Sequence, residues 1–322
     1  MFWRASGVLV MRTVRVTAAS TSARWGDLEG NLRKVRRAVE RAAHENSEMI
    51  LLPECCLTGG DWPMGARYPR VQDVALDLAS PAVREAGLMA RRAGLVIAVG
   101  FYERRAGRVN ISQALFSPRG LVGVYRKVHE GAKSSREREL FPVFDLGFAR
   151  VGVSVCRDNM LPESARLLAL AGAEVLLAPF MSLPLTRRAW RLGRLVALRA
   201  RAQDNRLFVL SASHAQAHVP GRPPEWGYSG ICCAIDPLGV VIGESRGRAG
   251  HPQHITVTLE AASQRTYLLA DVPAIRERRP RAYSALTSEQ VQRSYVKSAA
   301  PFRYNDRVDR LTVPQAGRRR GR

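Results

Sequence analysis

Hydrophobic and polar residues follow two different patterns along this chain. Short, almost uninterrupted apolar runs predict buried strands, and they occupy residues 14–19, 49–52, 95–101, 151–155, 175–179, 207–212 and 254–259. Longer stretches with an apolar residue at every third or fourth position predict amphipathic helices, at residues 28–42, 82–92, 164–171 and 188–204. Fully apolar strands that alternate with helices are typical of an α/β protein whose sheets are covered on their faces.

Turn residues join further strands directly to one another. Ser117-Pro-Arg-Gly120 separates the apolar segments 111–116 and 121–127, and a second hairpin is predicted around Leu238-Gly239. Hairpins pair strands antiparallel, so the sheets are predicted to be mixed. The order strand, helix, apolar strand, hairpin occurs in both halves of the chain, which predicts an internal pseudo-repeat.

Composition and charge narrow the class of protein. The chain has 322 residues and is 46% hydrophobic, enough for one large domain or two ordinary ones. Its formal net charge is +22, almost all of the basic excess being arginine. The arginines are scattered along the predicted helices and do not form a patch interleaved with aromatic residues, so a nucleic-acid partner is disfavoured against a small acidic or polar substrate. We expect an N-terminal extension at residues 1–12, one domain at 13–286 and a basic tail at 287–322, with Met11 as an alternative start.

The cysteines indicate a reducing compartment. Cys55, Cys56, Cys156, Cys232 and Cys233 lack the CxxC spacing of a zinc site or a disulfide framework. An odd number of cysteines without a signal peptide indicates the cytoplasm, and the apolar runs are too short to span a membrane. Residues 1–26 contain arginine and no acid, as transit peptides do, but residues 14–19 fit the first strand of the fold better.

Three reactive side chains follow predicted strands. Cys156 ends the strand at 151–155, at an elbow before a helix in whose first turn Pro162 fits well. A thiol at such an elbow is exposed at the sheet edge, near backbone N–H groups that favour a thiolate and hold an oxyanion. Glu54 and Lys127 also follow strands. Each residue alone fits an ordinary role better than a catalytic one: a buried cysteine, a strand-terminal carboxylate and a solvated lysine.

Taken in order, these residues and their neighbours resemble the carbon–nitrogen hydrolase, or nitrilase, superfamily over about residues 13–286. The matching motifs are Leu52-Pro-Glu54-Cys-Cys-Leu-Thr58-Gly59, Tyr125-Arg-Lys127-Val-His129, Gly152-Val-Ser-Val-Cys156-Arg-Asp158-Asn-Met-Leu-Pro162-Glu163, Gly172-Ala-Glu-Val-Leu-Leu-Ala-Pro179, Ala200-Arg-Ala-Gln-Asp-Asn205 and Asp236-Pro-Leu-Gly239. The resemblance implies a four-layer α-β-β-α sandwich with mixed sheets and internal pseudo-symmetry. It also implies a homodimer or larger homo-oligomer, and a reaction that needs no metal or organic cofactor.

The resemblance assigns roles to the three reactive residues. Cys156 attacks an amide, carbamoyl or nitrile carbon to form a thioester, and Glu54 takes the thiol proton and later activates water. Lys127 and the backbone N–H of Arg157 stabilise the oxyanion. In many relatives a second glutamate positions the substrate. Glu139 is the preferred candidate and Glu137 the alternative, in a loop that is shorter here than in those relatives.

The substrate class is narrowed by the residues after the cysteine. Arg157-Asp158 stands where true nitrilases have Trp-Glu, and the aspartate resembles the amidase and carbamoylase branches. This favours an amide or N-carbamoyl substrate over a nitrile. Arg157, Arg187 and Arg188 are candidates for binding a substrate carboxylate, and they equally fit surface positions. A true nitrilase and a catalytically silent binding or scaffold protein remain as alternatives.

Overall fold

The computed structural model of this chain describes residues 11–60, 70–130, 133–134, 140–181, 186–216, 227–262 and 277–287. The chain divides into two compact units, Met1–Ala270 and Asp271–Arg322. In the second unit the structure describes one element, the 3-10 helix η3 (Pro280–Thr287). The limits expected for the N-terminal extension and the basic tail stay predictions.

Two six-stranded sheets form the centre of the first unit. The first has the strand order β16-β1-β2-β3-β4-β5 and the second β15-β14-β11-β10-β9-β8. The strands of the first sheet are β1 (Val14–Ala19), β2 (Met49–Leu51), β3 (Val96–Arg105), β4 (Arg108–Ser117), β5 (Gly120–Arg126) and β16 (His254–Leu259). Those of the second are β8 (Val143–Asp145), β9 (Arg150–Val153), β10 (Val175–Phe180), β11 (Phe208–Ser213), β14 (Cys232–Ile235) and β15 (Val241–Glu244). Two short ribbons pair β6 (His129–Glu130) with β7 (Lys133–Ser134) and β12 (Ala215–Gln216) with β13 (Tyr228–Ser229).

The two sheets repeat one pairing pattern. In the first, β1, β2 and β3 are parallel neighbours, followed by the antiparallel β4 and β5, while β16 is antiparallel to β1. In the second, β9, β10 and β11 are parallel, followed by the antiparallel β14 and β15, while β8 is antiparallel to β9. The predicted mixed sheets and internal repeat are therefore confirmed.

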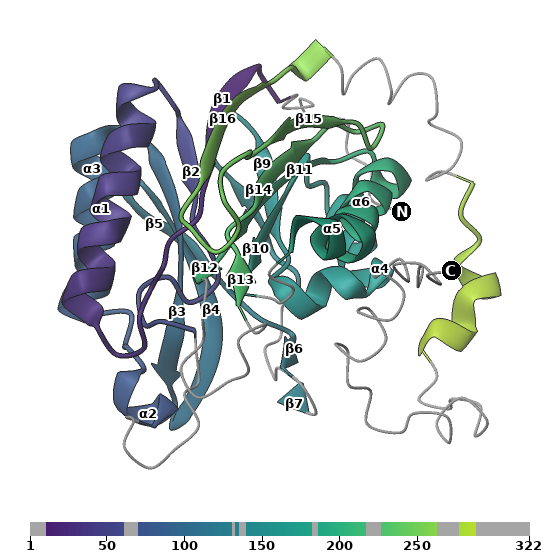
Figure 1. Ribbon diagram of the computed structural model, residues 1–322. Helices are drawn as coiled ribbons and strands as arrows, with labels where there is room; N and C mark the ends of the chain where they lie inside the picture. Colours follow the sequence, from purple (N-terminus) through teal and green to yellow (C-terminus); the bar gives the residue numbers. More distant parts are fainter. Residues whose placement is uncertain are drawn as a thin grey trace, which may run out of the picture. The chain divides into compact units, whose positions relative to one another are not determined.

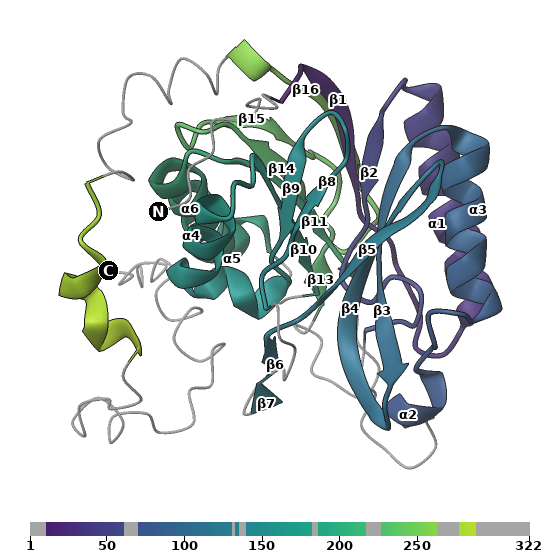
Figure 2. The same cartoon turned by 180° about the vertical axis from the view of Figure 1, so that it is seen from behind.

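Helices cover the outer face of each sheet (Figures 1 and 2). On the first sheet lie α1 (Leu28–His44) and α3 (Pro81–Ala93), and on the second lie α4 (Pro162–Leu170), α5 (Arg187–Trp190), the π-helical turn η2 (Arg191–Leu195) and α6 (Val196–Asn205). The shorter helical pieces are α2 (Val71–Val74) and the 3-10 turn η1 (Cys156–Met160). Asp27 caps the N-terminus of α1, its side chain accepting a hydrogen bond from the N–H of Gly30 at 3.0 Å. No helix among the described residues is long and apolar enough to cross a bilayer.

Alternation along the strands builds three apolar layers. In β10, Val175 and Leu177 belong to the core between the two sheets, whereas Leu176 and Ala178 belong to the core beneath the helices of the second sheet. A third core lies between the first sheet and its helices α1 and α3. A strand buried on both faces must be apolar at every position, which explains the uninterrupted runs. The predicted four-layer α-β-β-α sandwich is confirmed.

Several element boundaries differ from those predicted, and two of the differences lie in the half of the chain that carries Cys156. The strand before the cysteine ends at Val153, because the Asp158 side chain accepts a hydrogen bond from the N–H of Val155 and folds the following residues into η1. The helix predicted at 188–204 is interrupted by the π-helical turn η2. Such a turn holds one residue more than an α-helical turn, so it rotates the side chains that follow.

Candidate active site

The structure brings Glu54, Lys127 and Cys156 into one electrostatic cluster. Glu54 follows β2 and Lys127 follows β5, both in the first sheet. The Lys127 ammonium lies 2.7 Å from the Glu54 carboxylate, and the two side chains are only 8% and 1% exposed. Removing two charges from water costs free energy. A buried ion pair is therefore stable only when further hydrogen bonds satisfy its remaining polar atoms.

Met181, directly after β10, forms hydrogen bonds with both Glu54 and Cys156. Its backbone N–H donates to the other oxygen of Glu54 at 2.8 Å, and its carbonyl accepts from the Cys156 thiol at 3.8 Å. Glu54 and Cys156 therefore approach the same peptide segment from different sheets. No pattern of residue types pointed to Met181, because this contact is made by backbone atoms across the two sheets.

The charges in this cluster act on the thiol in opposite directions. The pKa of Cys156 is raised to about 12, mainly by burial and then by Glu54, while Lys127 and Arg194 act to lower it. Burial by itself would lower the pKa of Lys127, but Glu54 and Cys156 together hold that pKa above its ordinary value. The resting site at neutral pH is accordingly a neutral thiol beside a Glu54–Lys127 ion pair.

Strained backbone presents the thiol. Cys156 has a φ of 49°, in the left-handed region that residues other than glycine rarely occupy. Cys55, which follows the candidate base, has a φ of 53°. Such conformations cluster at functional sites, where the surrounding structure over-determines them.

Asp158 and Arg201 fix the turn that carries the thiol. Asp158 is fully buried and accepts hydrogen bonds from the Tyr125 hydroxyl at 2.6 Å, the His129 N–H at 2.9 Å and the Val155 N–H at 3.1 Å, and the His129 ring lies 2.7 Å away. It thereby ties the segment that carries Lys127 to the segment that carries Cys156. From α6, the Arg201 side chain donates hydrogen bonds to the carbonyl groups of Asn159 at 3.2 Å and Met160 at 3.4 Å, both in η1.

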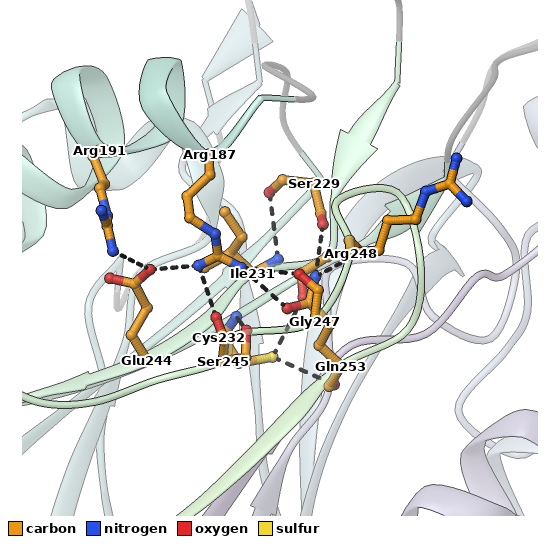
Figure 3. A network of polar contacts seen from close by, with 11 residues as sticks. Arg187, Arg191, Ser229, Ile231, Cys232, Glu244, Ser245, Gly247, Arg248 and Gln253 are labelled. Carbon is orange, nitrogen blue, oxygen red and sulfur yellow. Dashed lines mark hydrogen bonds and ion pairs between the residues drawn. The ribbon is translucent and has the colours of Figure 1, made fainter.

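The arginines proposed from the sequence lie in different surroundings. The side chains of Arg157 and Arg188 are exposed. Arg187 is held by Glu244, by the carbonyl groups of Ser245 at 2.7 Å and Gly247 at 3.1 Å, and by Gln253 (Figure 3). This network joins α5 to β15 and the following loop, so the described contacts of Arg187 are structural.

Two further expectations from the sequence concern the second glutamate and the need for a metal ion. Glu137 and Glu139 lie outside the described residues, so the second glutamate stays a prediction. In the part of the chain that the structure describes, no group of three or more histidine, cysteine or acidic side chains is arranged to hold a metal ion. Arg194, the second cation that acts on the thiol, was not among the candidates from the sequence, where it is one arginine among many.

The chain is similar in sequence and in fold to known proteins. The sequence profile of the carbon–nitrogen hydrolase family matches residues 13–265. A nitrilase from Pyrococcus abyssi is 30% identical over 191 residues, which cover 56% of this chain and 68% of that protein. An (R)-stereoselective amidase from a Pseudomonas species is 27% identical over 259 residues, covering 79% and 89% respectively. Among solved structures, an amidase from a Nesterenkonia species superposes with a TM-score of 0.68 at 22% identity, over 88% of this chain and 100% of that chain.

Proposed function

Because the chain belongs to the carbon–nitrogen hydrolase family, we propose that it hydrolyses a non-peptide amide or N-carbamoyl bond through a thioester on Cys156. The observation that carries the proposal is the joint contact of Glu54 with Lys127 and with the Met181 segment, which also receives the thiol. A base, a cation and a nucleophile held around one peptide segment are the parts that acyl transfer requires.

The first half-reaction forms the thioester. Glu54 takes the thiol proton while the sulfur of Cys156 bonds to the carbonyl carbon, and the carbonyl π electrons move onto oxygen. The ammonium of Lys127 and the backbone N–H of Arg157 stabilise this oxyanion. The carbon–nitrogen bond then breaks, and the nitrogen keeps the electron pair, receives the proton from Glu54 and leaves as ammonia or an amine.

The second half-reaction restores the enzyme. Glu54 takes a proton from water while the water oxygen bonds to the thioester carbon. The carbon–sulfur bond breaks, the sulfur recovers a proton, and the acid leaves. With an N-carbamoyl substrate the acid is a carbamic acid, which decomposes to carbon dioxide and an amine or ammonia.

Release of ammonia by the full chain tests this function. We expect release from at least one of butyramide, succinamate and N-carbamoylglycine, and a loss of about a thousandfold or more in Cys156→Ala, because the nucleophile is removed. Cys233→Ala is the matched control, since Cys233 is a fully buried thiol of the core beneath the helices of the second sheet, and this variant should retain activity. A folded chain that releases nothing from an extended amide and ureido panel contradicts the proposal and supports a silent scaffold.

The same panel separates the remaining alternatives. Activity on butyronitrile above that on butyramide would identify a true nitrilase. The relative rates on succinamate and N-carbamoylglycine would decide between the amidase and carbamoyl hydrolase types. The predicted homodimer and the cytoplasmic location stay predictions, which sedimentation and cell fractionation can test.

A further inference from the structure

We propose that a second cavity, at the edge of the second sheet, binds the phosphate group of a small organic phosphate ester. The cavity has a volume of about 560 Å³ and lies between the edge strand β15 and the helical segment formed by α5 and η2. The residues that line it are Arg187, Arg191, Val241, Ile242, Gly243, Glu244 and Arg246. They include no member of the candidate catalytic cluster, so this proposal does not depend on the proposed hydrolase function.

The lining carries more positive than negative charge. Arg187 of α5 and Arg191 of η2 both point toward Glu244 of β15 (Figure 3). One oxygen of this carboxylate accepts hydrogen bonds from both guanidinium groups, from Arg191 at 3.0 Å. A single carboxylate shared by two arginines does not balance their charge, and Arg246 adds a third cation. The lining therefore has two positive charges in excess, which attract an anionic ligand.

The fold fixes one of these arginines before any ligand binds. The Arg187 side chain also donates hydrogen bonds to the carbonyl groups of Ser245 at 2.7 Å and Gly247 at 3.1 Å, and to the side-chain oxygen of Gln253 at 3.5 Å (Figure 3). These acceptors are neutral, so they orient the guanidinium without cancelling its charge. The Arg187 side chain is 26% exposed, whereas that of Arg191 is 56% exposed and has room to turn toward a ligand. A cation that is already oriented lowers the entropy cost of binding.

The charge and the size of the cavity favour a phosphate ester over a simple anion. A phosphate monoester carries a charge of about −1.5 to −2 at pH 7, which matches the excess charge of the lining. Its oxygens suit the planar fork of arginine, which donates two parallel hydrogen bonds to one phosphate. A cavity of about 560 Å³ also has room for an organic group, and such a group would cover the apolar side chains of Val241 and Ile242.

Calorimetric titration of the full chain with phenyl phosphate tests the site. We expect one phenyl phosphate to bind per chain, more tightly than inorganic phosphate, because the ring covers Val241 and Ile242. A chain alkylated at Cys156 with iodoacetamide should bind phenyl phosphate as the untreated chain does, since the catalytic cluster does not line the cavity. Loss of binding on alkylation overturns the proposal, because the phosphate would then occupy the candidate active site.

Matched arginine variants locate the bound phosphate. Arg191→Gln and Arg246→Gln should each weaken phenyl phosphate binding about tenfold, because each removes a charge-assisted hydrogen bond. Both side chains are exposed, so we expect these variants to fold. Arg188→Gln is the control, since Arg188 is also exposed on α5 but does not line the cavity, and its affinity should stay within about twofold of the wild-type value. An equal loss in Arg188→Gln overturns the proposal, because the binding would then reflect the net charge of +22.

Replacing the acid gives a test with the opposite sign. Glu244→Gln keeps an oxygen that accepts from both arginines but removes the negative charge that competes with the ligand, so phosphate affinity should rise about threefold or more. Arginines that served only to tie α5 to β15 would bind no phosphate in either protein, and that result overturns the proposal. Weaker binding in Glu244→Gln, with an unfolding transition in urea like that of the wild type, also overturns it, because the carboxylate would then not compete with the ligand.

Discussion

At the scale of single residues, the site depends on which charge faces the thiol. Cys156 is partly buried, whereas the other four cysteines, Cys55, Cys56, Cys232 and Cys233, are fully buried. Its pKa is raised by burial and then by Glu54, so the reaction that we propose requires Glu54 to take the thiol proton as the sulfur reacts. Accessibility and an adjacent base, and not a preformed thiolate, distinguish this cysteine from the others.

Replacing Glu54 should therefore lower both the rate of amide hydrolysis and the pKa of the thiol. In Glu54→Gln we expect amide hydrolysis to fall about a hundredfold or more, because the group that takes the proton is lost. We expect the pKa of Cys156 to fall below its value of about 12, because the negative charge that raises it is gone. Alkylation by iodoacetamide, followed against pH, measures that pKa, with peptide mapping to confirm the site. A thiol pKa that stays the same or rises in this variant would show that Glu54 does not face Cys156.

At the scale of elements, β3 makes room for the turn that carries the base. Gly100 lies against the backbone of Pro53 and Cys55, and a Cβ placed on it would stand 2.6 Å from atoms of both residues. The Gly100 carbonyl accepts the N–H of Leu57 at 3.0 Å. Because Gly100 of β3 has no side chain, the chain after β2 can fold back closely enough for Glu54 to reach Lys127.

Adding a methyl group at this position should disturb the site and the fold together. Gly100→Ala is expected to lower the free energy of unfolding by about 1–3 kcal/mol, because the new methyl group meets backbone atoms of Pro53 and Cys55 that cannot swing away. Activity should fall further than stability alone explains, since the Glu54 turn must move. Urea unfolding and kcat on the best amide substrate measure the two effects. Wild-type stability and activity in this variant would mean that the close approach is not needed.

At the scale of the whole molecule, the site lies where the two halves meet. Glu54 and Lys127 follow strands of the first sheet, while Cys156 and Met181 follow strands of the second. The core between the sheets draws on residues of both, so the same apolar packing that forms the sandwich brings the acid and the thiol together.

Burial of thiols in these layers makes the free energy of unfolding depend on pH in the alkaline range. The folded protein raises the pKa of Cys56, Cys156 and Cys232 to about 12, in each case mainly by burial, from an ordinary value of 9.0. Between these values the unfolded chain loses protons that the folded chain keeps. Stability is therefore fully present below about pH 9 and is lost as the pH rises toward 12.

A cysteine substitution away from the site tests this pH dependence. Cys232 lies in the core between the sheets, and Cys232→Ala should make the loss of stability shallower by about 1.4 kcal/mol per pH unit above pH 9. Denaturant unfolding of the variant and the wild type from pH 7 to 11 measures the two slopes. Parallel curves would show that this thiol titrates alike in the folded and unfolded chain.

The hydrophobic pattern by itself determined the layers of this protein. A strand covered on both faces must be apolar at every position, and a helix on a sheet must be apolar on one side, so runs such as 175–179 and 28–42 identify their elements without further information. The candidate site residues Glu54, Lys127 and Cys156 were also singled out from the sequence, because their order along the chain matches a family, and their roles stay a proposal. Boundaries such as Val153 were less accurate, because the Asp158 side chain ends the strand.

Only the tertiary structure decided which groups surround the thiol. Met181 acts through backbone atoms, Gly100 through the absence of a side chain, and Arg194 through an interrupted helix. None of these properties is carried by a local pattern of residue types. Each depends on contacts between segments that are distant along the chain, and these form only when the two sheets pack.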